Sequence, residues 1–273
     1  MDFASDVTFF WLSLVIYSVS CLFYLVFLAT EQSQISRIAS YIALTAFILQ
    51  TLAMTMRSIQ SGHLPLTNMF EFISVFAWFA AIFYFIALKL FKNDIIGPFI
   101  LPIIFMLLVS ASLLPKDKSM QLVPALQSYW LQIHVSLAAS AEAAFLIAFA
   151  ANIMYFLKKY ISEKSSFAKR LPELEKLDYY SYKAITVGFP LFTVGALFAG
   201  AIWAEQAWGI FWSWDPKEVC SLVVWLIYSA YLHARFVKGW KGTRAAVLSV
   251  IGFICTILTV FSNMVLGGLH AYG

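Results

Sequence analysis

Eight runs of about 20 apolar residues constrain the fold of this chain more than any other feature of its sequence. They lie at about 7–29, 38–56, 69–90, 95–114, 131–157, 184–203, 220–237 and 246–267. A run of this length crosses the hydrocarbon core of a bilayer as an α-helix, because a helix satisfies its own backbone hydrogen bonds there. The other spanning structure, a closed β-barrel, needs alternating segments of roughly ten residues, which the sequence lacks.

The composition points the same way. Of the 273 residues, 62% are hydrophobic and only 12% are charged, and the mean hydropathy is +0.83. A water-soluble domain of this length does not need so much apolar surface. We therefore predict an all-α, polytopic membrane protein with about eight transmembrane helices, in which residues 1–273 form a single transmembrane helical domain.

Lys and Arg are unequally divided between the two sets of loops that these spans define. One set holds fourteen: Arg37, Lys89, Lys92, Lys158, Lys159, Lys164, Lys169, Arg170, Lys176, Lys183, Arg235, Lys238, Lys241 and Arg244. The other set holds four: Arg57, Lys116, Lys118 and Lys217. Because cytoplasmic loops carry the excess of positive charge, we predict that the first set, including a basic loop at 158–183, is cytoplasmic. Both termini are then extracytoplasmic, and the basic residues face membrane lipid and need no nucleic-acid partner.

An aromatic loop, predicted at 204–219, lies on the extracytoplasmic side. Its central stretch, WGIFWSWDPKEV at 208–219, holds three tryptophans within seven residues, and charged side chains follow them directly. Tryptophans are common at membrane surfaces, where their amphipathic rings favour the headgroup region. Flat rings gathered beside charges also suit a platform for a flat ligand. The residues alone leave both interpretations open.

Two histidines, His134 and His270, fall near the same surface as this loop, but on different helices. Two imidazoles can ligate one iron with a planar macrocycle between them. For the carboxylates at the edge of a porphyrin, the candidate partners are Arg57, Lys217 and the backbone amides of 212–215.

The remaining polar groups near the spans carry weaker signals. His233 comes about 13 residues after the outer start of its span, so it lies roughly 20 Å down, in the inner half of the bilayer. An intramembrane histidine is either a functional group or one partner of a hydrogen bond between helices. Arg235 reads as an anchor that reaches cytoplasmic headgroups. Glu71 and Glu142 are either neutral and hydrogen-bonded or parts of a proton relay.

The three cysteines, Cys21, Cys220 and Cys255, are far apart in sequence and form no CxxC pair. This spacing does not favour thiol–disulfide exchange or a zinc site. No side chain in the sequence stands out as a catalytic acid, base or nucleophile.

The stretch WGIFWSWDPKEVCSLVVWLIYSAYLHARF resembles the tryptophan-rich WWD signature of haem-handling proteins in cytochrome c maturation. The resemblance is greatest to the CcsA (ResC) family of the System II pathway. Residues 238–273 are similar to the end of that family, and SGHLPLTNMFEF at 61–72 is similar to another of its motifs, with Phe70 replacing the usual Tyr. CcmC and CcmF of System I share the loop, but eight spans favour CcsA.

The resemblance implies haem b as the cofactor. It implies that His134 and His270 are axial ligands of haem iron beside the loop, and that His233 ligates haem arriving from the cytoplasmic side. It also implies direct haem contact by five residues of the loop: Trp208, Gly209, Trp212, Trp214 and Asp215. His63 matches a motif of the family but carries no implied ligand role.

The resemblance also implies partners and a function. The inner site lacks a second histidine, which in the family comes from the membrane partner CcsB (ResB). We expect the chain to be one component of a cytochrome c haem lyase complex, which presents haem to the CxxCH segment of an apocytochrome c kept reduced by thiol-reducing proteins. The alternative is a CcmC-like haem exporter or chaperone without ligation activity. The chain has no transit segment, so we expect the bacterial cytoplasmic (inner) membrane rather than the thylakoid.

Overall fold

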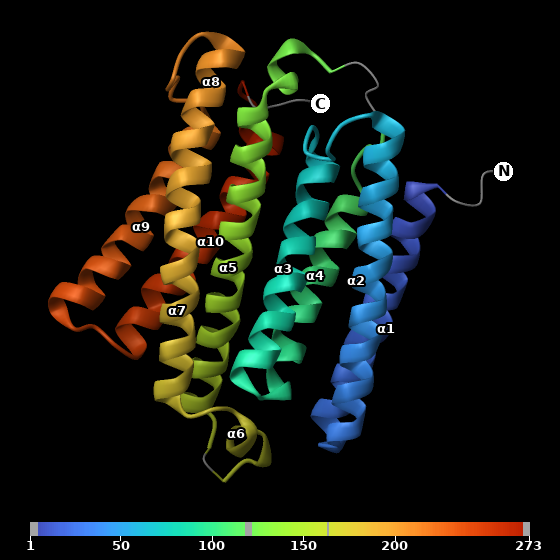
Figure 1. Ribbon diagram of the computed structural model, residues 1–273. Coiled ribbons are helices and arrows are strands. Elements are labelled where there is room, and N and C mark those ends of the chain that lie inside the picture. Colours follow the sequence, from blue (N-terminus) through green and yellow to red (C-terminus); the bar gives the residue numbers. More distant parts are fainter. Residues whose placement is uncertain (1–4, 118–121, 163, 270–273) are drawn as a thin grey trace. The chain divides into compact units, whose positions relative to one another are not determined.

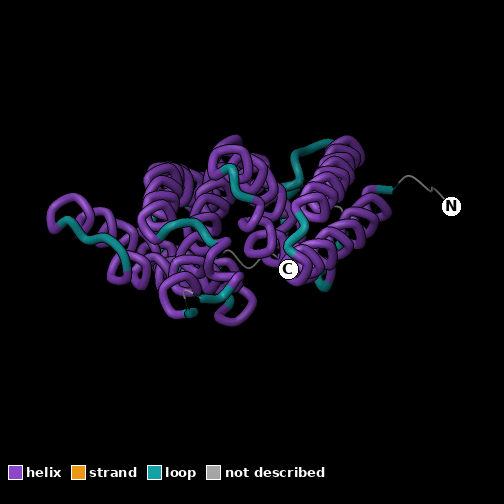
Figure 2. The backbone as a smooth tube through the Cα atoms, turned by 90° about the horizontal axis from the view of Figure 1, so that it is seen from below, coloured by secondary structure: helices purple, strands orange, loops and turns teal. Residues whose placement is uncertain are grey.

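The computed structural model describes residues 5–117, 122–162 and 164–269, and this part of the chain consists of helices and loops without strands (Figures 1 and 2). Within it, eight helical segments are long and apolar enough to cross a membrane: Asp6–Thr30, Ser33–Ser61, Met69–Phe91, Asp94–Ser112, Tyr129–Tyr160, Leu174–Trp208, Pro216–Lys238 and Thr243–Ser262. Each corresponds to one predicted run. The all-α, polytopic prediction is confirmed, and the chain is a multi-pass membrane protein.

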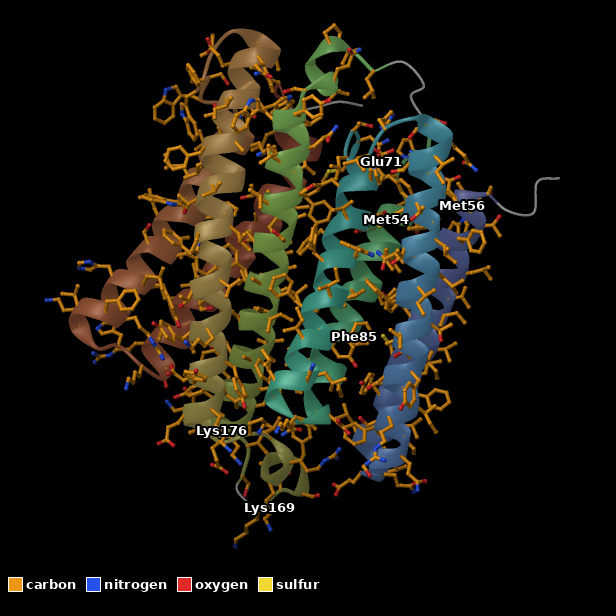
Figure 3. All side chains as sticks on the ribbon, in the orientation of Figure 1. Met54, Met56, Glu71, Phe85, Lys169 and Lys176 are labelled. Carbon is orange, nitrogen blue, oxygen red and sulfur yellow. The ribbon has the colours of Figure 1, made fainter. Side chains whose placement is uncertain are left out.

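The ends of the helices differ from the predicted spans, most clearly around the basic loop predicted at 158–183. Helix α5 (Tyr129–Tyr160) continues to Tyr160, a short helix α6 (Ser166–Arg170) follows, and α7 (Leu174–Phe192) begins well before the predicted span at 184–203. Polar and charged residues continue these helices beyond the apolar runs, so hydropathy alone places the ends too far inward. Lys169 and Lys176 project at this end (Figure 3).

The chain divides into two compact units, Met1–Gln121 and Leu122–Gly273. The sequence predicted one transmembrane domain over residues 1–273, and the division into compact units does not test whether the two units fold as one domain. The described part of the first unit contains α1 (Asp6–Thr30), α2 (Ser33–Ser61), α3 (Met69–Phe91), the 3₁₀ turn η1 (Asp94–Ile96) and α4 (Gly97–Ser112). Helix α1 packs along α2 and α4, and α4 also packs on α3.

Two pairs of buried polar side chains link helices of the first unit. Tyr24 and Tyr84 join their hydroxyls at 2.6 Å, and the Tyr17 hydroxyl donates to Gln50 Oε1 at 3.1 Å. Each pair links two helices across an apolar core. A hydroxyl buried away from water costs free energy unless it has such a partner, so these bonds favour one packing of the helices.

Arg57, at the end of α2, is the centre of a buried ion-pair cluster in this unit. Its guanidinium donates to Glu71 Oε1 at 2.6 Å and to Asp6 Oδ2 at 3.1 Å. It also donates to the carbonyl oxygens of Lys116 and Asp117, and the residue is only 2% exposed. The interpretation of Arg57 as a partner for ligand carboxylates is therefore wrong, because the cluster already engages its guanidinium. Glu71 (Figure 3) is likewise an ion-pair partner of Arg57.

The second unit is built around α5. It also contains the 3₁₀ turn η2 (Pro124–Gln127), α6, α7, a π-helical segment η3 (Thr193–Ala199), α8 (Gly200–Trp208), α9 (Pro216–Lys238) and α10 (Thr243–Leu266). Residues 138–148 of α5 are all buried, and most of them are alanines. Small side chains allow the close approach of α7 and α10. Helices α9 and α10 pack against each other as a pair.

Candidate functional site

The aromatic loop of the second unit spans 209–215 and is shorter than the predicted 204–219, because helices continue into both of its ends. Helix α8 stops at Trp208, where Gly209 adopts a left-handed conformation (φ +79°) and donates its N–H to the carbonyl of Glu205. Pro216 begins α9, a position at which its missing N–H costs nothing.

Two carboxylates hold the end of this loop. Glu218 Oε2 accepts hydrogen bonds from Ser213 N (2.8 Å), Ser213 Oγ (3.2 Å) and Asp215 N (3.2 Å). Asp215 Oδ1 in turn accepts from Lys217 N at 3.0 Å, which makes a reciprocal capping box at the start of α9. The amides of Ser213 and Asp215 are thus engaged by Glu218, so the prediction that they bind ligand carboxylates does not hold in this structure.

The two tryptophans of the loop differ in exposure: Trp214 is exposed, whereas Trp212 is half-buried. Trp212 and Trp214 meet edge to face, with ring centroids 5.9 Å apart and an interplanar angle of 89°. Trp214 is 69% exposed and has a left-handed backbone (φ +61°), which is unfavourable for a bulky residue. Phe211, beside them, is 56% exposed. Strained backbone of this kind persists only where neighbouring contacts impose it, and here the capping box does so.

His134 lies on α5, one turn and a half inside the helix, and its ring nitrogens are distinguished by a hydrogen bond. The distance from Nδ1 to the carbonyl oxygen of Gly195 is 2.8 Å. A carbonyl only accepts, so Nδ1 carries the proton and donates. In the neutral ring Nε2 then carries the lone pair. This is the tautomer of most metal-binding histidines, which donate their second N–H to a carbonyl or a carboxylate.

The π-helical segment explains why the Gly195 carbonyl is in reach of His134. The N–H of Gly200 donates to the Gly195 carbonyl across five residues, the wider spacing of a π-helix. Gly200 itself packs on the imidazole. A Cβ added there would lie 2.9 Å from Nδ1 of His134 and 3.0 Å from Cε1, closer than real Cβ atoms approach without displacement of a neighbour.

Trp203, which was not among the residues predicted for the site, stacks on one face of His134. The two rings stack with centroids 5.8 Å apart and an interplanar angle of 11°. Trp203 is buried, and its Nε1–H donates to the carbonyl of Ala125 at 2.7 Å. Its ring also meets Trp208 edge to face at 4.8 Å. In the sequence, Trp203 lies five residues before Trp208 and directly before the predicted loop at 204–219. Its closeness to the three tryptophans of 208–214 was the one sign that it could belong to the site.

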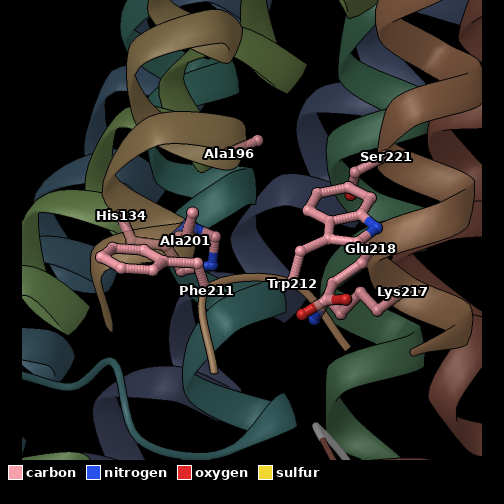
Figure 4. A pocket seen from close by; sticks show the side chains of 9 residues that line it. His134, Ala196, Ala201, Phe211, Trp212, Lys217, Glu218 and Ser221 are labelled. Atoms are coloured by element: carbon pink, nitrogen blue, oxygen red, sulfur yellow. The ribbon is translucent and has the colours of Figure 1, made fainter. Parts of the chain in front are cut away.

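His134 and the aromatic loop share one cavity (Figure 4). His134 and Phe211 line one side, and Trp212, Lys217 and Glu218 line the other. The cavity has a volume of about 30 Å³, enough for ordered water but far too little for a porphyrin. The structure therefore brings a predicted ligand, two of the loop's rings and a lysine to one place, around a cavity that is itself too small to enclose a large ring.

His270 lies outside the described residues. The last described residue before it, Leu269, donates its N–H to Asp215 Oδ2 at 2.6 Å. Asp215 is 6% exposed, and both of its carboxylate oxygens accept backbone hydrogen bonds. The segment that leads to His270 therefore starts beside the beginning of α9.

His233 is exposed on α9 and makes no hydrogen bond or ion pair within the described part of the chain. Arg235, two residues on, behaves differently from the prediction that it anchors to headgroups. It donates to both carboxylate oxygens of Asp178, at 2.8 and 2.6 Å, and its side chain is largely buried. Two residues turn a helix by about 200°, so His233 and Arg235 lie on opposite sides of α9.

The region of the chain that contains these site residues also matches known proteins. A family model described as "Cytochrome C assembly protein" matches residues 66–270, which include the aromatic loop, His134 and His233. The chain belongs to the cytochrome c assembly protein family. A curated relative, "Cytochrome c biogenesis protein CcsA" of Guillardia theta, is 35% identical over all of this chain and 96% of its own length. The CcsA of Prochlorococcus marinus is 36% identical over 87% of this chain and 84% of its own.

A solved structure shares the fold of this member of the cytochrome c assembly family. "Cytochrome c Heme Lyase CcmF" superposes with a TM-score of 0.71 at 16% identity, over 94% of this chain. This chain spans 46% of the length of that protein. The described residues contain no group of three or more His, Cys, Asp and Glu side chains arranged for a metal ion.

Proposed function

We propose that this chain takes haem b from the cytoplasmic side, holds it at an extracytoplasmic site beside the aromatic loop, and presents it to an apocytochrome c for attachment. One observation carries the proposal. His134 donates through Nδ1 to Gly195, which orients Nε2 as the ligating nitrogen, and the same histidine lines a cavity with Trp212 of the loop. Membership of a cytochrome c assembly family makes haem the ligand that this combination of imidazole and flat rings suits best.

The size of the cavity indicates where the haem macrocycle lies. A cavity of about 30 Å³ is too small for a porphyrin. The ring must therefore lie against the exposed aromatic side chains of the loop, of which Trp214 and Phe211 present most surface. Trp208 and Trp212 are the inner rings of the same group, and together these side chains exclude water from one face of the ligand.

His270 is the proposed second axial ligand. It follows Leu269, whose N–H is bound to Asp215 at the base of the loop. Two imidazoles favour low-spin iron and help to protect ferrous haem against oxidation, and thioether formation requires the reduced state. The thiols of a CxxCH segment add across the haem vinyl groups, sulfur to one carbon and hydrogen to the other, so this step has no leaving group.

His233 is the proposed ligand of an inner site. Its exposure on α9, and the absence of any hydrogen bond from it within the described residues, suit a ligand that another protein completes. We propose CcsB (ResB) as that protein. The CcsA relatives come from an alga and a cyanobacterium, so the proposed location is the bacterial cytoplasmic membrane or a thylakoid membrane.

Co-expression with an apocytochrome c and the membrane partner tests the proposal. We expect covalent haem, detected by haem stain after denaturing electrophoresis, with the native chain and none with a His134→Ala variant. If the native complex binds and moves haem but never forms covalent cytochrome, the chain is an exporter or chaperone of the CcmC kind. If the purified complex holds no haem at all, both functions are excluded.

A further inference from the structure

Asp215 joins two segments that are 54 residues apart in the sequence. Its Oδ1 accepts the N–H of Lys217 and caps α9, while its Oδ2 accepts the N–H of Leu269, beyond the end of α10. A helix cap needs only one acceptor, and Asn or Ser serves as well as Asp at that position. The second oxygen of Asp215 therefore does something that capping does not require.

The segment Gly267–Leu269 is shaped to reach this oxygen. Gly267 and Gly268 both have positive φ, +68° and +118°. A Cβ added to Gly268 would collide with Asp215 Oδ2 and would come within 3.2 Å of Pro216 Cδ. Only glycine at 268 permits both the backbone conformation and the close approach. The contact therefore depends on Gly268 as well as on Asp215.

The hydrogen bond itself is short and protected. The distance from Leu269 N to Asp215 Oδ2 is 2.6 Å, and Asp215 is 6% exposed. An ionised acceptor strengthens a bond of this kind, and burial protects it from competition by water. It is made by Leu269, the last residue that the structure describes before His270.

We propose that Asp215 is a positioning residue: it fixes the Gly267–Leu269 turn against α9, and this turn leads directly into His270, the second iron ligand of the proposed function. This inference rests on the proposed function, because it assumes that His270 ligates haem iron. Asp215 then acts through His270 and not by contact with haem, which differs from the direct contact implied by the family resemblance. Asp215 thereby joins the aromatic loop to the turn that precedes His270, since the residue that ends the loop also binds Leu269.

The tether is the hydrogen bond from Leu269 N to Asp215 Oδ2. Two variants break it, one on each side of the contact, and both leave the cap of α9 in place. Asp215→Asn keeps a good cap and nearly the same size, but its amide offers one acceptor oxygen where two backbone N–H groups need one each. Gly268→Ala leaves Asp215 intact and prevents the turn from approaching it. The control is Gly239→Ala, which also places an alanine at a positive φ (+63°, against +118° at Gly268), at the other end of α9, where an added Cβ meets nothing within 4 Å.

The measurement is the absorption spectrum of haem in the purified complex of full-length chain and membrane partner, before and after addition of imidazole. We expect both tether variants to retain haem, to lose the low-spin bis-imidazole spectrum and to regain it with added imidazole, as His270→Ala should. The control variant should keep the native spectrum. A merely structural role for Asp215 predicts loss of haem or of protein, which imidazole does not restore.

The native protein and His270→Ala separate this inference from the proposed function. If the native complex lacks haem, or His270→Ala keeps the native spectrum, the proposed ligand set has failed. If those two behave as expected but Asp215→Asn or Gly268→Ala keeps the native spectrum, or imidazole restores neither, the positioning role is wrong. Either tether variant alone is sufficient for the test if the other does not accumulate.

Discussion

His134 is held from several directions at once. Its Nδ1–H donates to the Gly195 carbonyl, one ring face stacks on Trp203, and Gly200 packs against its edge. Each contact restricts the imidazole to one tautomer or one orientation. A ligand held in this way loses little conformational entropy when it binds a metal, so these neighbours should contribute to affinity although they do not contact the metal.

Gly200→Ala should weaken haem binding without removal of any ligand. The new Cβ would lie 2.9 Å from Nδ1 of His134, so the ring must move and its bond to Gly195 must lengthen. Loss of such a supporting contact typically costs about 10–100-fold in metal affinity. Haem retention by the purified complex during dilution measures this effect. Gly188→Ala is the control, because it crowds α5 at Phe145, away from the site, and should leave haem retention near the native level.

Arg57→Met should destabilise the first unit. The substitution leaves Asp6 and Glu71 as buried carboxylates without their cation, and loss of one partner from a buried ion pair costs about 3–5 kcal/mol. We expect a lower thermal unfolding temperature in detergent, followed by circular dichroism. Arg37→Met, on the exposed side of the same helix, should change it little. Equal stability of both variants would contradict the structural role of the cluster.

At the scale of elements, the position of the helices was predictable and the details that build the site were not. Apolar length alone locates the eight spans, because the bilayer demands about 20 apolar residues of each. The π-helical turn at Thr193–Ala199 has no comparable signal, since it depends on contacts with α5. Arg57 reads as a surface cation in the sequence, and only the fold reveals that Asp6, 51 residues away, is its partner.

Glu218→Ala should loosen the aromatic loop. Three hydrogen bonds to Glu218 Oε2 hold Ser213 and the amide of Asp215, and loss of a helix cap costs about 0.5–2 kcal/mol. We expect faster amide hydrogen exchange in peptides that cover 209–215. Glu205→Ala is the control, because that carboxylate makes no hydrogen bond or ion pair within the described residues. Unchanged exchange in the Glu218 variant would mean that other contacts hold the loop.

At the scale of the whole molecule, the orientation in the membrane rests on charge alone. The division of Lys and Arg predicts that the aromatic loop is extracytoplasmic and that the loop after α5 is cytoplasmic. Two of the basic residues in that count, Arg57 and Arg235, are ion-paired inside their units. The remaining charges still give the same asymmetry, so the prediction does not depend on these two.

Single-cysteine labelling tests this orientation. In a variant whose cysteines Cys21, Cys220 and Cys255 are replaced by serine, Ile210→Cys should react with a membrane-impermeant maleimide in intact spheroplasts. Lys164→Cys, in the loop after α5, should react only after the membrane is opened. The reverse pattern would place the aromatic loop in the cytoplasm and exclude delivery of haem to an extracytoplasmic cytochrome from this site.

The central claim is that two histidines, and not the tryptophans, hold the iron, and the spectrum of purified His134→Ala and His270→Ala complexes tests it most directly. Each variant should lose the low-spin spectrum of bis-imidazole haem, and added imidazole should restore it. A matched Trp212→Phe variant should bind less haem but keep that spectrum in the haem that remains. Unchanged low-spin spectra in both histidine variants would contradict the account and require other ligands for the iron.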